Sequence, residues 1–373
     1  MQVLIAAGGT AGHINPALAI AGVIQKHCPD AGIHFAGRQK GMECGLVAKA
    51  GYAFHPIEVN GIQRRLTLKN IGRNAVALYH LALAAPRADA ILKEVQPDLV
   101  IGAGGYVSGP VLRAAAKRGV LTAIHEQNAF PGVTNKILAK QVDLIFAAMP
   151  DAVERLGAQE KTVVVGNPVR EEMLHTDRAA ARRALGVRDG QVLLVSFGGS
   201  LGAQRVNEVV AELAAWELAG RDFKHIHATG SIEKADFAKL AAEKKLTGDA
   251  RFEIREYIDD MPQLLAAADL VISRAGALTL AEIAAVGRAS VLIPSPNVAE
   301  NHQYYNALQL QKLGAAVVVE EKDLTGAKLI AIVEELTKDP ARLMEMGVKA
   351  RALAQPDSLE KIWAALETKL KKA

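Results

Sequence analysis

Short apolar runs alternate with longer segments of helical periodicity along the first half of the chain. The apolar runs, which predict buried strands, are 3–7, 33–36, 99–101, 121–124, 144–147 and 162–165. The segments between them that predict helices are 15–27, 41–50, 111–118 and 135–140. Strands that alternate with helices form a parallel sheet covered by helices on both faces. The first half is therefore predicted to be an α/β domain.

A second series of apolar runs predicts a second domain of the same kind. Its predicted strands are 192–197, 224–229, 252–255, 270–272, 290–293 and 316–319. Between the two series lies Gly166-Asn167-Pro168-Val169-Arg170, a Gly/Pro break that is typical of a hinge.

The last segment of the chain is predicted to be a helix that returns to the first domain. Pro356-Asp357-Ser358 is a helix-start signal, and an apolar face follows as far as about Leu370. The residues on that face are Leu359, Ile362, Trp363 and Leu366. We therefore predict a first domain of residues 1–165 plus 356–373 and a second domain of residues 166–355.

The two halves share a glycine pattern directly after their first strand. Gly8-Gly9-Thr10-x-Gly12 corresponds to Gly198-Gly199-Ser200-x-Gly202, and 98–101 corresponds to 269–272. The repeat predicts two similar doubly wound domains that face each other, with the carboxyl ends of both sheets at one cleft. Ligands of open α/β sheets bind at those ends.

Composition narrows the class of protein. The chain has 373 residues, of which 50% are hydrophobic and 23% charged, and this is ordinary for a globular protein. Its net charge of +4 is too small to indicate nucleic acid. Cys28 and Cys44 are the only cysteines, so we expect a reducing cytoplasm and neither disulfides nor a cysteine zinc site. We expect no signal peptide, because the start lacks a basic segment, and no membrane-spanning helix.

Both glycine turns are candidate anion sites, although a tight turn alone would also need these glycines. A strand, a glycine turn and a helix in that order present backbone N–H groups and the positive end of the helix dipole. Neither turn has the Gly-Lys-Ser/Thr of a P-loop. Neither has the G-x-G-x-x-G spacing of a dinucleotide site, and no acid follows the second strand at Ala36-Gly37-Arg38, which disfavours NAD.

His13 lies beyond the first glycine turn, at the start of the first helix. A histidine there would point into the cleft, and its ordinary pKa of about 6.5 suits a general base at neutral pH. The alternatives are that His13 binds phosphate or simply packs.

Four other loops after predicted strands carry candidate chemistry. The glycine density of 102–110 suggests close approach of the backbone to a ligand. His125-Glu126-Gln127-Asn128 has more polar side chains than helix capping needs. The loop 274–279 opens a helix in which Glu282 would reach a ribose diol or pair with the helix dipole. Glu300-Asn301-His302-Gln303 offers amide and imidazole groups suited to sugar hydroxyls.

Together these motifs resemble those of the MurG family of bacterial glycosyltransferases. The motifs that carry the resemblance are Gly-Gly-Thr-Ala-Gly-His (8–13), Gly-Ala-Gly-Gly-Tyr-Val-Ser-Gly-Pro (102–110), His-Glu-Gln-Asn (125–128), Gly-Asn-Pro-Val-Arg (166–170), Gly-Gly-Ser-Leu-Gly-Ala (198–203), Arg-Ala-Gly-Ala-Leu-Thr-Leu-Ala-Glu (274–282) and His-Gln-Tyr-Tyr-Asn-Ala (302–307). They follow the family's order over nearly the whole chain. The resemblance implies the two-domain GT-B fold. It also implies transfer of N-acetylglucosamine from UDP-GlcNAc to the C4 hydroxyl of the MurNAc sugar of lipid I, which makes lipid II for peptidoglycan.

The resemblance also implies roles for individual residues. On the acceptor side these are Tyr106, His125 and Glu126, and the catalytic residues are His13 and Glu126. For UDP-GlcNAc they are Thr10, Ala11, Gly12, His13, Asn128, Arg170, Ser200, Asn207, Ile258, Met261, Ala277, Leu278, Thr279, Glu282, His302 and Gln303. Within that set, Glu282 would bind the ribose, and His302 and Gln303 the GlcNAc hydroxyls. Ala11, Ala275 and His302 stand where many or some members have Gly, Ser and Gln respectively.

The residues and the resemblance predict the same type of reaction, an inverting single displacement. His13 would take the proton of the acceptor hydroxyl as that oxygen attacks the anomeric carbon. Backbone N–H groups at 277–279 would stabilise the leaving UDP. No Asp-x-Asp pair is present to chelate a metal-bound diphosphate, so no obligatory cofactor or metal is expected.

Residues 59–88 contain no acidic residue. The basic and apolar residues that would form a membrane patch there are Arg64, Arg65, Lys69, Ile71, Arg73 and Leu78. An apolar face with basic flanks suits an anionic bilayer surface, although an ordinary helix with a solvated basic edge has the same composition. With a lipid-linked acceptor, the resemblance implies a peripheral protein on the cytoplasmic face of the inner membrane. It would act in cell-wall synthesis, shape and division, alongside other cell-wall synthesis proteins.

Three alternatives are open. The first is another GT-B enzyme that uses a UDP-sugar, either an epimerase or a transferase with a small acceptor. The second is a nucleotide-sugar sensor without catalysis, against which His13 and the cluster 125–128 count. The third is an NAD(P)-dependent oxidoreductase, which the glycine spacing disfavours.

Overall fold

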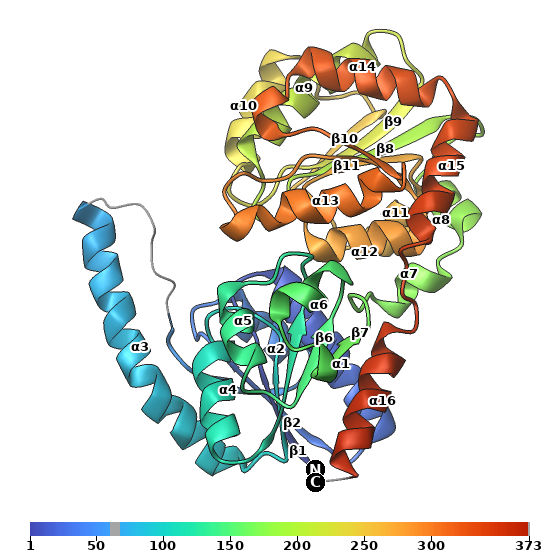
Figure 1. The fold of residues 1–373 in the computed structure, drawn as a ribbon. Helices are drawn as coiled ribbons and strands as arrows, with labels where there is room; N and C mark the ends of the chain where they lie inside the picture. The colour runs from blue at the N-terminus through green and yellow to red at the C-terminus, as the bar shows by residue number, and fades with distance from the viewer. Residues whose placement is uncertain (60–67, 372–373) are drawn as a thin grey trace. The chain divides into compact units, whose positions relative to one another are not determined.

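The computed structural model describes residues 1–59 and 68–371, without the side chains of residues 68–79, 81, 82 and 299. The chain divides into two compact units. Unit 1 comprises Met1–Pro168 and Asp357–Ala373, and unit 2 comprises Val169–Pro356 (Figure 1). The division after Pro168 lies inside the Gly/Pro segment 166–170.

Unit 1 is built on a parallel seven-stranded sheet with the order β3-β2-β1-β4-β5-β6-β7. The strands are β1 (Gln2–Ala6), β2 (Gly32–Gly37), β3 (Ala53–Pro56), β4 (Leu99–Gly102), β5 (Leu121–Glu126), β6 (Leu144–Ala147) and β7 (Thr162–Val164). The helices are α1 (Ala11–His27), α2 (Met42–Lys49), α3 (Leu68–Val95), α4 (Ser108–Lys117), α5 (Val133–Ala139), α6 (Asp151–Leu156), the 3-10 helix η1 (Gln159–Lys161) and α16 (Ser358–Leu370). The predicted α/β class is confirmed, because β1 lies between β2 and β4 in parallel register.

Helices cover both faces of the unit 1 sheet because successive side chains of a strand point to opposite faces. Leu4 belongs to a core that includes Leu92 of α3 and Leu112 of α4. Its neighbour Ile5 belongs to the opposite core, together with α1 and α16. Helix α16, at the end of the chain, belongs to unit 1 (Figure 1). Its Ile362 is fully buried in that second core, as the apolar face of the predicted returning helix requires.

Unit 2 is built on a parallel six-stranded sheet with the order β10-β9-β8-β11-β12-β13. The strands are β8 (Val192–Phe197), β9 (Phe223–Ala228), β10 (Phe252–Arg255), β11 (Leu270–Ser273), β12 (Ala289–Leu292) and β13 (Ala316–Val318). The helices are α7 (Glu171–His175), α8 (Arg178–Ala184), α9 (Gln204–Leu218), α10 (Lys234–Glu243), α11 (Met261–Ala267), α12 (Ala277–Val286), α13 (His302–Lys312), α14 (Gly326–Thr337) and α15 (Pro340–Arg351), with the 3-10 helices η2 (Ala299–Asn301) and η3 (Glu321–Asp323).

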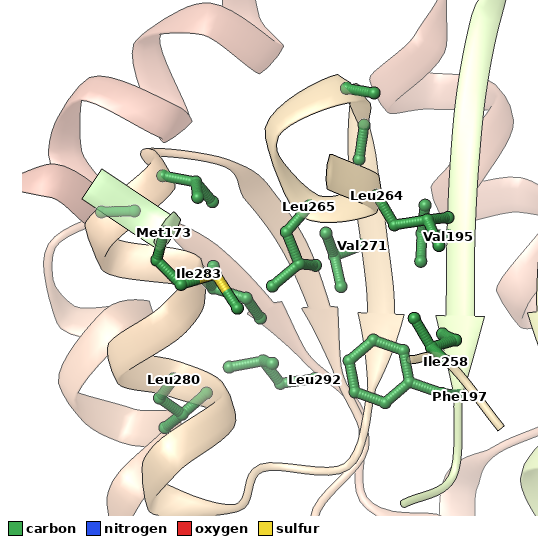
Figure 2. Close-up of a cluster of buried hydrophobic side chains, with 14 of the residues drawn as sticks. Met173, Val195, Phe197, Ile258, Leu264, Leu265, Val271, Leu280, Ile283 and Leu292 are labelled. Carbon is green, nitrogen blue, oxygen red and sulfur yellow. The ribbon is translucent and has the colours of Figure 1, made fainter. Parts of the chain in front are cut away.

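One core of unit 2 fixes the position of α12, which carries predicted site residues. Figure 2 shows Leu280 and Ile283 of α12 directed toward the same cluster as Leu292 of β12 and Phe197 of β8. Leu280 and Ile283 are one turn apart and almost fully buried, so they fix the position of α12 relative to the sheet.

Every strand predicted from an apolar run is present, and the structure adds the edge strand β3. Its four residues are at most half-buried and end in Pro56, so no apolar run marks it. Helix α1 begins at Ala11, about one turn earlier than predicted, and Pro16 lies inside the helix. Among the helices of the described residues, none has the length and apolar character needed to cross a bilayer.

Only part of the predicted membrane patch lies among the described residues. Arg64 and Arg65 lie outside the described residues. The backbone of Lys69, Ile71, Arg73 and Leu78 belongs to α3, and their side chains are outside the description. The later part of α3 packs on the unit 1 core through Ala84, Ala88, Ile91 and Leu92.

Candidate functional site

Three loops of unit 1 meet at the carboxyl ends of the neighbouring strands β1, β4 and β5. The side chain of Ser108 joins the first two loops, since its hydroxyl accepts a hydrogen bond from Gly104 N at 3.2 Å and lies 3.1 Å from Ala6 O. Gln127 Nε2 donates to Ala103 O at 2.7 Å, which joins the second loop to the third. The predicted loops 8–13, 102–110 and 125–128 are therefore in contact.

The glycines of the loop after β4 serve contacts within the chain. Gly104 (φ +106°) and Gly105 (φ +82°) have backbone conformations that favour glycine. A methyl group at Gly104 would lie 2.5 Å from Cδ2 of His13, and one at Gly105 would overlap the carbonyl oxygen of Gly8. Close approach to the chain's own backbone and to His13 thus explains the glycine density that suggested a ligand.

His13 lies in the first turn of α1, and its ring is held in one tautomer. Nδ1 lies 3.0 Å from the carbonyl oxygen of Gly8. A carbonyl oxygen only accepts hydrogen bonds, so Nδ1 carries the proton and Nε2 of the neutral ring is the unprotonated nitrogen. Burial lowers the pKa of His13, against the opposing effects of the Gly8 carbonyl and the Glu43 charge. A neutral ring with an unprotonated Nε2 is the form that a general base requires.

His125 is completely buried beneath these loops. Its Nδ1 accepts a hydrogen bond from Gln127 Nε2 at 3.0 Å, and its Nε2 donates to Gly166 O at 3.4 Å. Burial lowers the pKa of His125 to about 4, so the ring is neutral at pH 7. The side chain of His125 is 0% exposed, so we expect it to support the loop and not to contact an acceptor.

Both oxygens of Glu126 are occupied by hydrogen bonds within unit 1. Oε1 accepts from the backbone N of Asn128 at 2.9 Å and from its Nδ2 at 3.1 Å. Oε2 accepts from Gly132 N at 3.1 Å and from Asn135 Nδ2 at 2.8 Å. Burial raises the pKa of Glu126, and these four bonds oppose that effect. Glu126 thus fixes the loop that carries Asn128 and the start of α5.

The other predicted residues of unit 1 described next lie at the N-terminus of α1 and in the loop after β4. Thr10 is the exposed N-cap residue of α1, and its side chain makes no cap hydrogen bond. Ala11 and Gly12, the first two residues of α1, are half-buried. The helix N-terminus therefore has no side-chain cap, which leaves it suited to an anion. Tyr106 is 59% exposed beside the two glycines with positive φ.

The glycine turn of unit 2 follows β8 and packs on the turn after β9. A methyl group at Gly202 (φ +91°) would overlap Thr229 O, and one at Gly230 (φ +80°) would overlap the backbone of Gly202. Ser200 lies in this turn, where its carbonyl oxygen accepts from Ser231 N at 3.2 Å. Helix α9 begins only at Gln204, so Gly202 lies in the turn before its helix, whereas Gly12, the corresponding glycine of unit 1, lies inside α1.

Glu282 and the N-terminus of α12 form a second polar region in unit 2. Ala277, Leu278 and Thr279 are the first three residues of α12, whose N-cap residue is Gly276 and whose first turn contains no acidic residue. Glu282 is 8% exposed, and among the described residues its only charged partner is Arg170, 4.0 Å away. Burial raises the pKa of Glu282 to about 7, because that distant guanidinium offsets little of the desolvation.

The remaining predicted donor residues have mixed settings. Asn207 Nδ2 donates to Thr229 O at 3.0 Å, and its buried Oδ1 has no hydrogen-bond partner among the described residues. Ile258 is buried in the core of Figure 2, and Met261 packs against it at the start of α11. His302 begins α13, and the neighbouring Gln303 Oε1 accepts from Ser295 N at 2.9 Å, which ties α13 to the loop after β12.

A serine, a histidine and a glutamate also lie together in unit 2, but in its interior. Ser196 Oγ is 2.7 Å from His225 Nε2, and His225 Nδ1 is 2.9 Å from Glu217 Oε2. All three are at most 3% exposed, so a substrate has no access to them. The same hydroxyl contacts His227, whose pKa burial lowers to about 3. We assign this cluster to the packing of β8, β9 and α9.

Sequence reasoning missed one buried ionisable group close to His13. Glu43 in the first turn of α2 is 1% exposed, and its charge acts on His13. The signal was the spacing Gly37-x-x-x-Gly41-x-Glu43 after β2, an acid preceded by two glycines. No group of three or more His, Cys, Asp or Glu side chains is placed to hold a metal ion in the part of the chain that the structure describes.

The fold of this chain is similar to that of solved glycosyltransferase and epimerase structures. The crystal structure of MurG from Acinetobacter baumannii matches 98% of this chain and 99% of its own, with a TM-score of 0.75 and 28% identity. A UDP-GlcNAc 2-epimerase from Neisseria meningitidis, bound to UDP-GlcNAc, has a TM-score of 0.69 over 99% of this chain at 13% identity, which shows the fold alone. Two Rossmann-like parallel-sheet units with loop sites at the strand ends define the GT-B class.

The sequence comparisons then define the family. Residues 3–147 match the glycosyltransferase family 28 N-terminal domain, and residues 192–362 match its C-terminal domain. A relative from Acetivibrio thermocellus, 42% identical over 100% of this chain and 99% of its own, is named UDP-N-acetylglucosamine–N-acetylmuramyl-(pentapeptide) pyrophosphoryl-undecaprenol N-acetylglucosamine transferase. A relative of the same name from Desulfitobacterium hafniense is 43% identical over 97% of each chain. The chain belongs to glycosyltransferase family 28 and, within it, to the MurG transferases.

Proposed function

We propose that this chain transfers N-acetylglucosamine from UDP-GlcNAc to the C4 hydroxyl of the MurNAc sugar of lipid I, which makes lipid II for peptidoglycan synthesis. The observation that carries the proposal is the match, over essentially the whole chain, to relatives named for this transfer. The geometry at His13 supports it, since the ring is set to accept a proton at Nε2.

In the proposed step, the acceptor oxygen attacks the anomeric carbon while the bond from that carbon to the diphosphate oxygen breaks. The hydroxyl proton passes to Nε2 of His13, and UDP leaves with the bonding electron pair. The anomeric configuration inverts, because a single displacement occurs. Of the two predicted catalytic residues, we keep His13 as the base. We assign Glu126 the role of holding Asn128, because its four hydrogen bonds leave its oxygens occupied.

Unit 2 would bind the donor. The N-terminal turn of α12, at Ala277, Leu278 and Thr279, would stabilise the diphosphate and the developing negative charge of UDP through the positive end of the helix dipole. Glu282 would accept hydrogen bonds from the ribose diol, since the described residues give it only a distant Arg170. The residues proposed around the uridine, diphosphate and sugar are Arg170, Ser200, Asn207, Ile258, Met261, His302 and Gln303.

Unit 1 would bind the acceptor. Exposed Tyr106 and the Asn128 held by Glu126 are the groups proposed to contact the sugars. The resemblance assigns Thr10, Ala11 and Gly12 to UDP-GlcNAc, and their place at the N-terminus of α1 suits a phosphate group. His125 would support this region from below.

The test is an assay with labelled UDP-GlcNAc and a lipid I analogue. We expect UDP release and a labelled disaccharide lipid, both dependent on the acceptor. A sample without acceptor is the matched control, because an epimerase would change UDP-GlcNAc there. Donor binding without acceptor-dependent transfer would overturn the proposal in favour of a sensor or an epimerase.

We extend the proposal to a peripheral position on the inner face of the plasma membrane. The basic and apolar residues of 59–88 support it, and so do the exposed side chains of Val133 and Ile137, one turn apart on α5 and 54% and 50% exposed. Lys136 and Lys140 lie on the same helix segment. Apolar side chains flanked by lysines suit an anionic lipid surface. Contacts with other cell-wall synthesis proteins would follow from this location.

Co-sedimentation with vesicles tests the membrane proposal. We expect binding to vesicles that contain phosphatidylglycerol at low salt, weaker binding at high salt, and none to phosphatidylcholine. Lys69→Glu with Arg73→Glu should abolish it. Lys244→Glu with Lys245→Glu, the same charge change at exposed residues of unit 2, should leave it unchanged. Equal sedimentation with both vesicle types, or none with either, would contradict the electrostatic surface.

A further inference from the structure

A buried carboxylate that the proposed reaction does not use lies behind His13. Glu43 Oε1 accepts a hydrogen bond from Arg38 N at 3.0 Å, and Arg38 Nε lies 3.5 Å from the same oxygen. Oε2 is buried and has no hydrogen-bond partner among the residues that the structure describes. An unsatisfied buried carboxylate oxygen destabilises a fold, so its presence needs a physical reason.

Three glycines make room for this carboxylate. A methyl group at Gly8 would lie 2.7 Å from Oε1, and one at Gly37 would lie 2.7 Å from Cγ of Glu43. A methyl group at Gly41 would overlap the carboxylate itself. The charge therefore lies directly against the backbone of the turns after β1 and β2, in a position that a side chain at residue 8, 37 or 41 would block.

Gly8 links this carboxylate to the base. The Glu43 carboxylate touches Gly8, and the carbonyl oxygen of Gly8 accepts the Nδ1 proton of His13 at 3.0 Å. The negative charge favours the protonated ring, and Glu43 raises the pKa of His13 against the effect of burial. The other titratable group whose charge interacts with His13 is His125 of β5, and Arg38 lies beside Glu43.

We propose that Glu43 is a positioning residue for His13. Its carboxylate holds the Gly8 turn against the ring and stabilises the imidazolium that forms when Nε2 takes the proton of the acceptor hydroxyl. Glu43 itself exchanges no proton. The kinetic consequence rests on the proposed function, whereas the effect on the ring of His13 does not.

The first test is independent of catalysis. The His13 ring is titrated by NMR, and its signal is assigned by its loss in His13→Gln. Glu43→Gln should lower the pKa of His13 by roughly 0.5–1 pH unit, because it removes the neighbouring charge and keeps the side-chain shape. Glu160→Gln, the same change at an exposed residue of η1, should leave it unchanged. An unchanged His13 titration in Glu43→Gln would overturn the proposal.

Arg38→Gln keeps the test decisive where Glu43→Gln fails to fold. It changes a half-exposed side chain and removes the positive charge beside Glu43, so the pKa of His13 should rise. A His13 titration that stays the same or moves downward would overturn the proposal equally.

The second test uses transfer kinetics. In Glu43→Gln the acid limb of kcat/KM should move to lower pH, and kcat should fall about tenfold with the KM for UDP-GlcNAc unchanged. Glu43→Asp, which keeps the charge, should restore the acid limb. A lower melting temperature with an unmoved acid limb would mean a structural role only. If the wild-type chain transfers nothing, the proposed function fails, and the NMR titration still decides the role of Glu43.

Discussion

Glu126 of unit 1 and Glu282 of unit 2 are both buried carboxylates near strand ends, and the two units treat them in opposite ways. Glu126 accepts four hydrogen bonds from its own loop and from the start of α5. Glu282 has one charged partner in the described structure, Arg170, at 4.0 Å. Burial raises the pKa of both, and for Glu282 the pKa reaches about 7.

The difference indicates how each unit contributes to a reaction. A carboxylate whose acceptor capacity is filled by the fold organises other groups before any ligand arrives. A carboxylate that the fold leaves unsatisfied gains most when a ligand supplies hydrogen-bond donors. This difference supports the proposal that unit 1 is organised for chemistry, with His13 already in the tautomer that a base requires, and that unit 2 binds a donor that completes its hydrogen bonds.

Replacing the base should have the largest effect and should fall on chemistry alone. In His13→Ala we expect kcat to fall by about 10²- to 10⁴-fold, the usual contribution of a general base. UDP affinity, measured by calorimetry, should change far less than kcat, because we propose that the uridine and the diphosphate bind to unit 2. His175→Ala, at an exposed histidine of α7, is the control. A fall in kcat of less than tenfold would contradict the assignment of the base.

Exchanging each carboxylate for its amide tests the comparison directly. Glu126→Gln replaces an oxygen that accepts two hydrogen bonds by an NH₂ group that donates, so we expect the free energy of unfolding to fall by about 3 kcal/mol. Glu282→Gln removes a poorly compensated buried charge, so at pH 8 the free energy of unfolding should stay the same or rise. Urea denaturation of both variants measures this. Equal losses would show that the two sites do not differ.

The pH dependence of stability should carry the signature of Glu282. Its pKa is raised from the ordinary 4.5 to about 7, so the unfolded chain ionises first as the pH rises. Its contribution to stability is therefore complete below about pH 4.5 and lost as the pH rises through 7, by at most roughly 3 kcal/mol. In Glu282→Gln this loss should disappear from denaturation curves measured between pH 4.5 and 8. An identical slope in wild type and variant would contradict the raised pKa.

The sequence predicted the strands and loops well because apolar runs and glycine turns are local signals. Val3–Ile5 and Leu99–Ile101 are buried on both faces of a parallel sheet, and such strands are apolar throughout. The loops 8–13, 102–110 and 125–128 follow the neighbouring strands β1, β4 and β5, so the order of the strands in the sheet is enough to bring them together.

Sequence reasoning failed where a role depends on a contact between distant residues. The glycines 104 and 105 are explained by His13 and Gly8, which are nearly one hundred positions away. The catalytic role of Glu126 is implied by the family resemblance and stays a prediction, whereas its four hydrogen bonds to Asn128, Gly132 and Asn135 can be seen only when β5 and α5 are folded. Glu43 lies in the first turn of a helix, as many acidic residues do, so the spacing of Gly37 and Gly41 before it gains its meaning only from the burial of Glu43 against Gly8.

Truncating Glu282 should weaken donor binding and spare the chemical step. We expect Glu282→Ala to raise the Kd of UDP about tenfold to a hundredfold, since hydrogen bonds to a charged group contribute about 1.5–3 kcal/mol. The kcat at saturating UDP-GlcNAc should change by less than threefold or so, in contrast to His13→Ala. Calorimetry and initial rates measure the two quantities. Unchanged UDP affinity would place the ribose elsewhere.

The smallest expected effect comes from disturbing the packing of Gly104 against the His13 ring. Gly104→Ala and Gly51→Ala both put alanine at a positive φ, +106° and +81°, so each should lower the free energy of unfolding by at least about 1 kcal/mol, and Gly104→Ala by more because of an added overlap. Only the methyl group at Gly104 meets His13, at 2.5 Å from Cδ2, whereas that at Gly51 meets nothing within 4 Å. We therefore expect kcat to fall about tenfold in Gly104→Ala and to stay at the wild-type value in Gly51→Ala. Equal kcat values in the two variants would mean that the His13 ring accommodates the displacement without loss of its catalytic position.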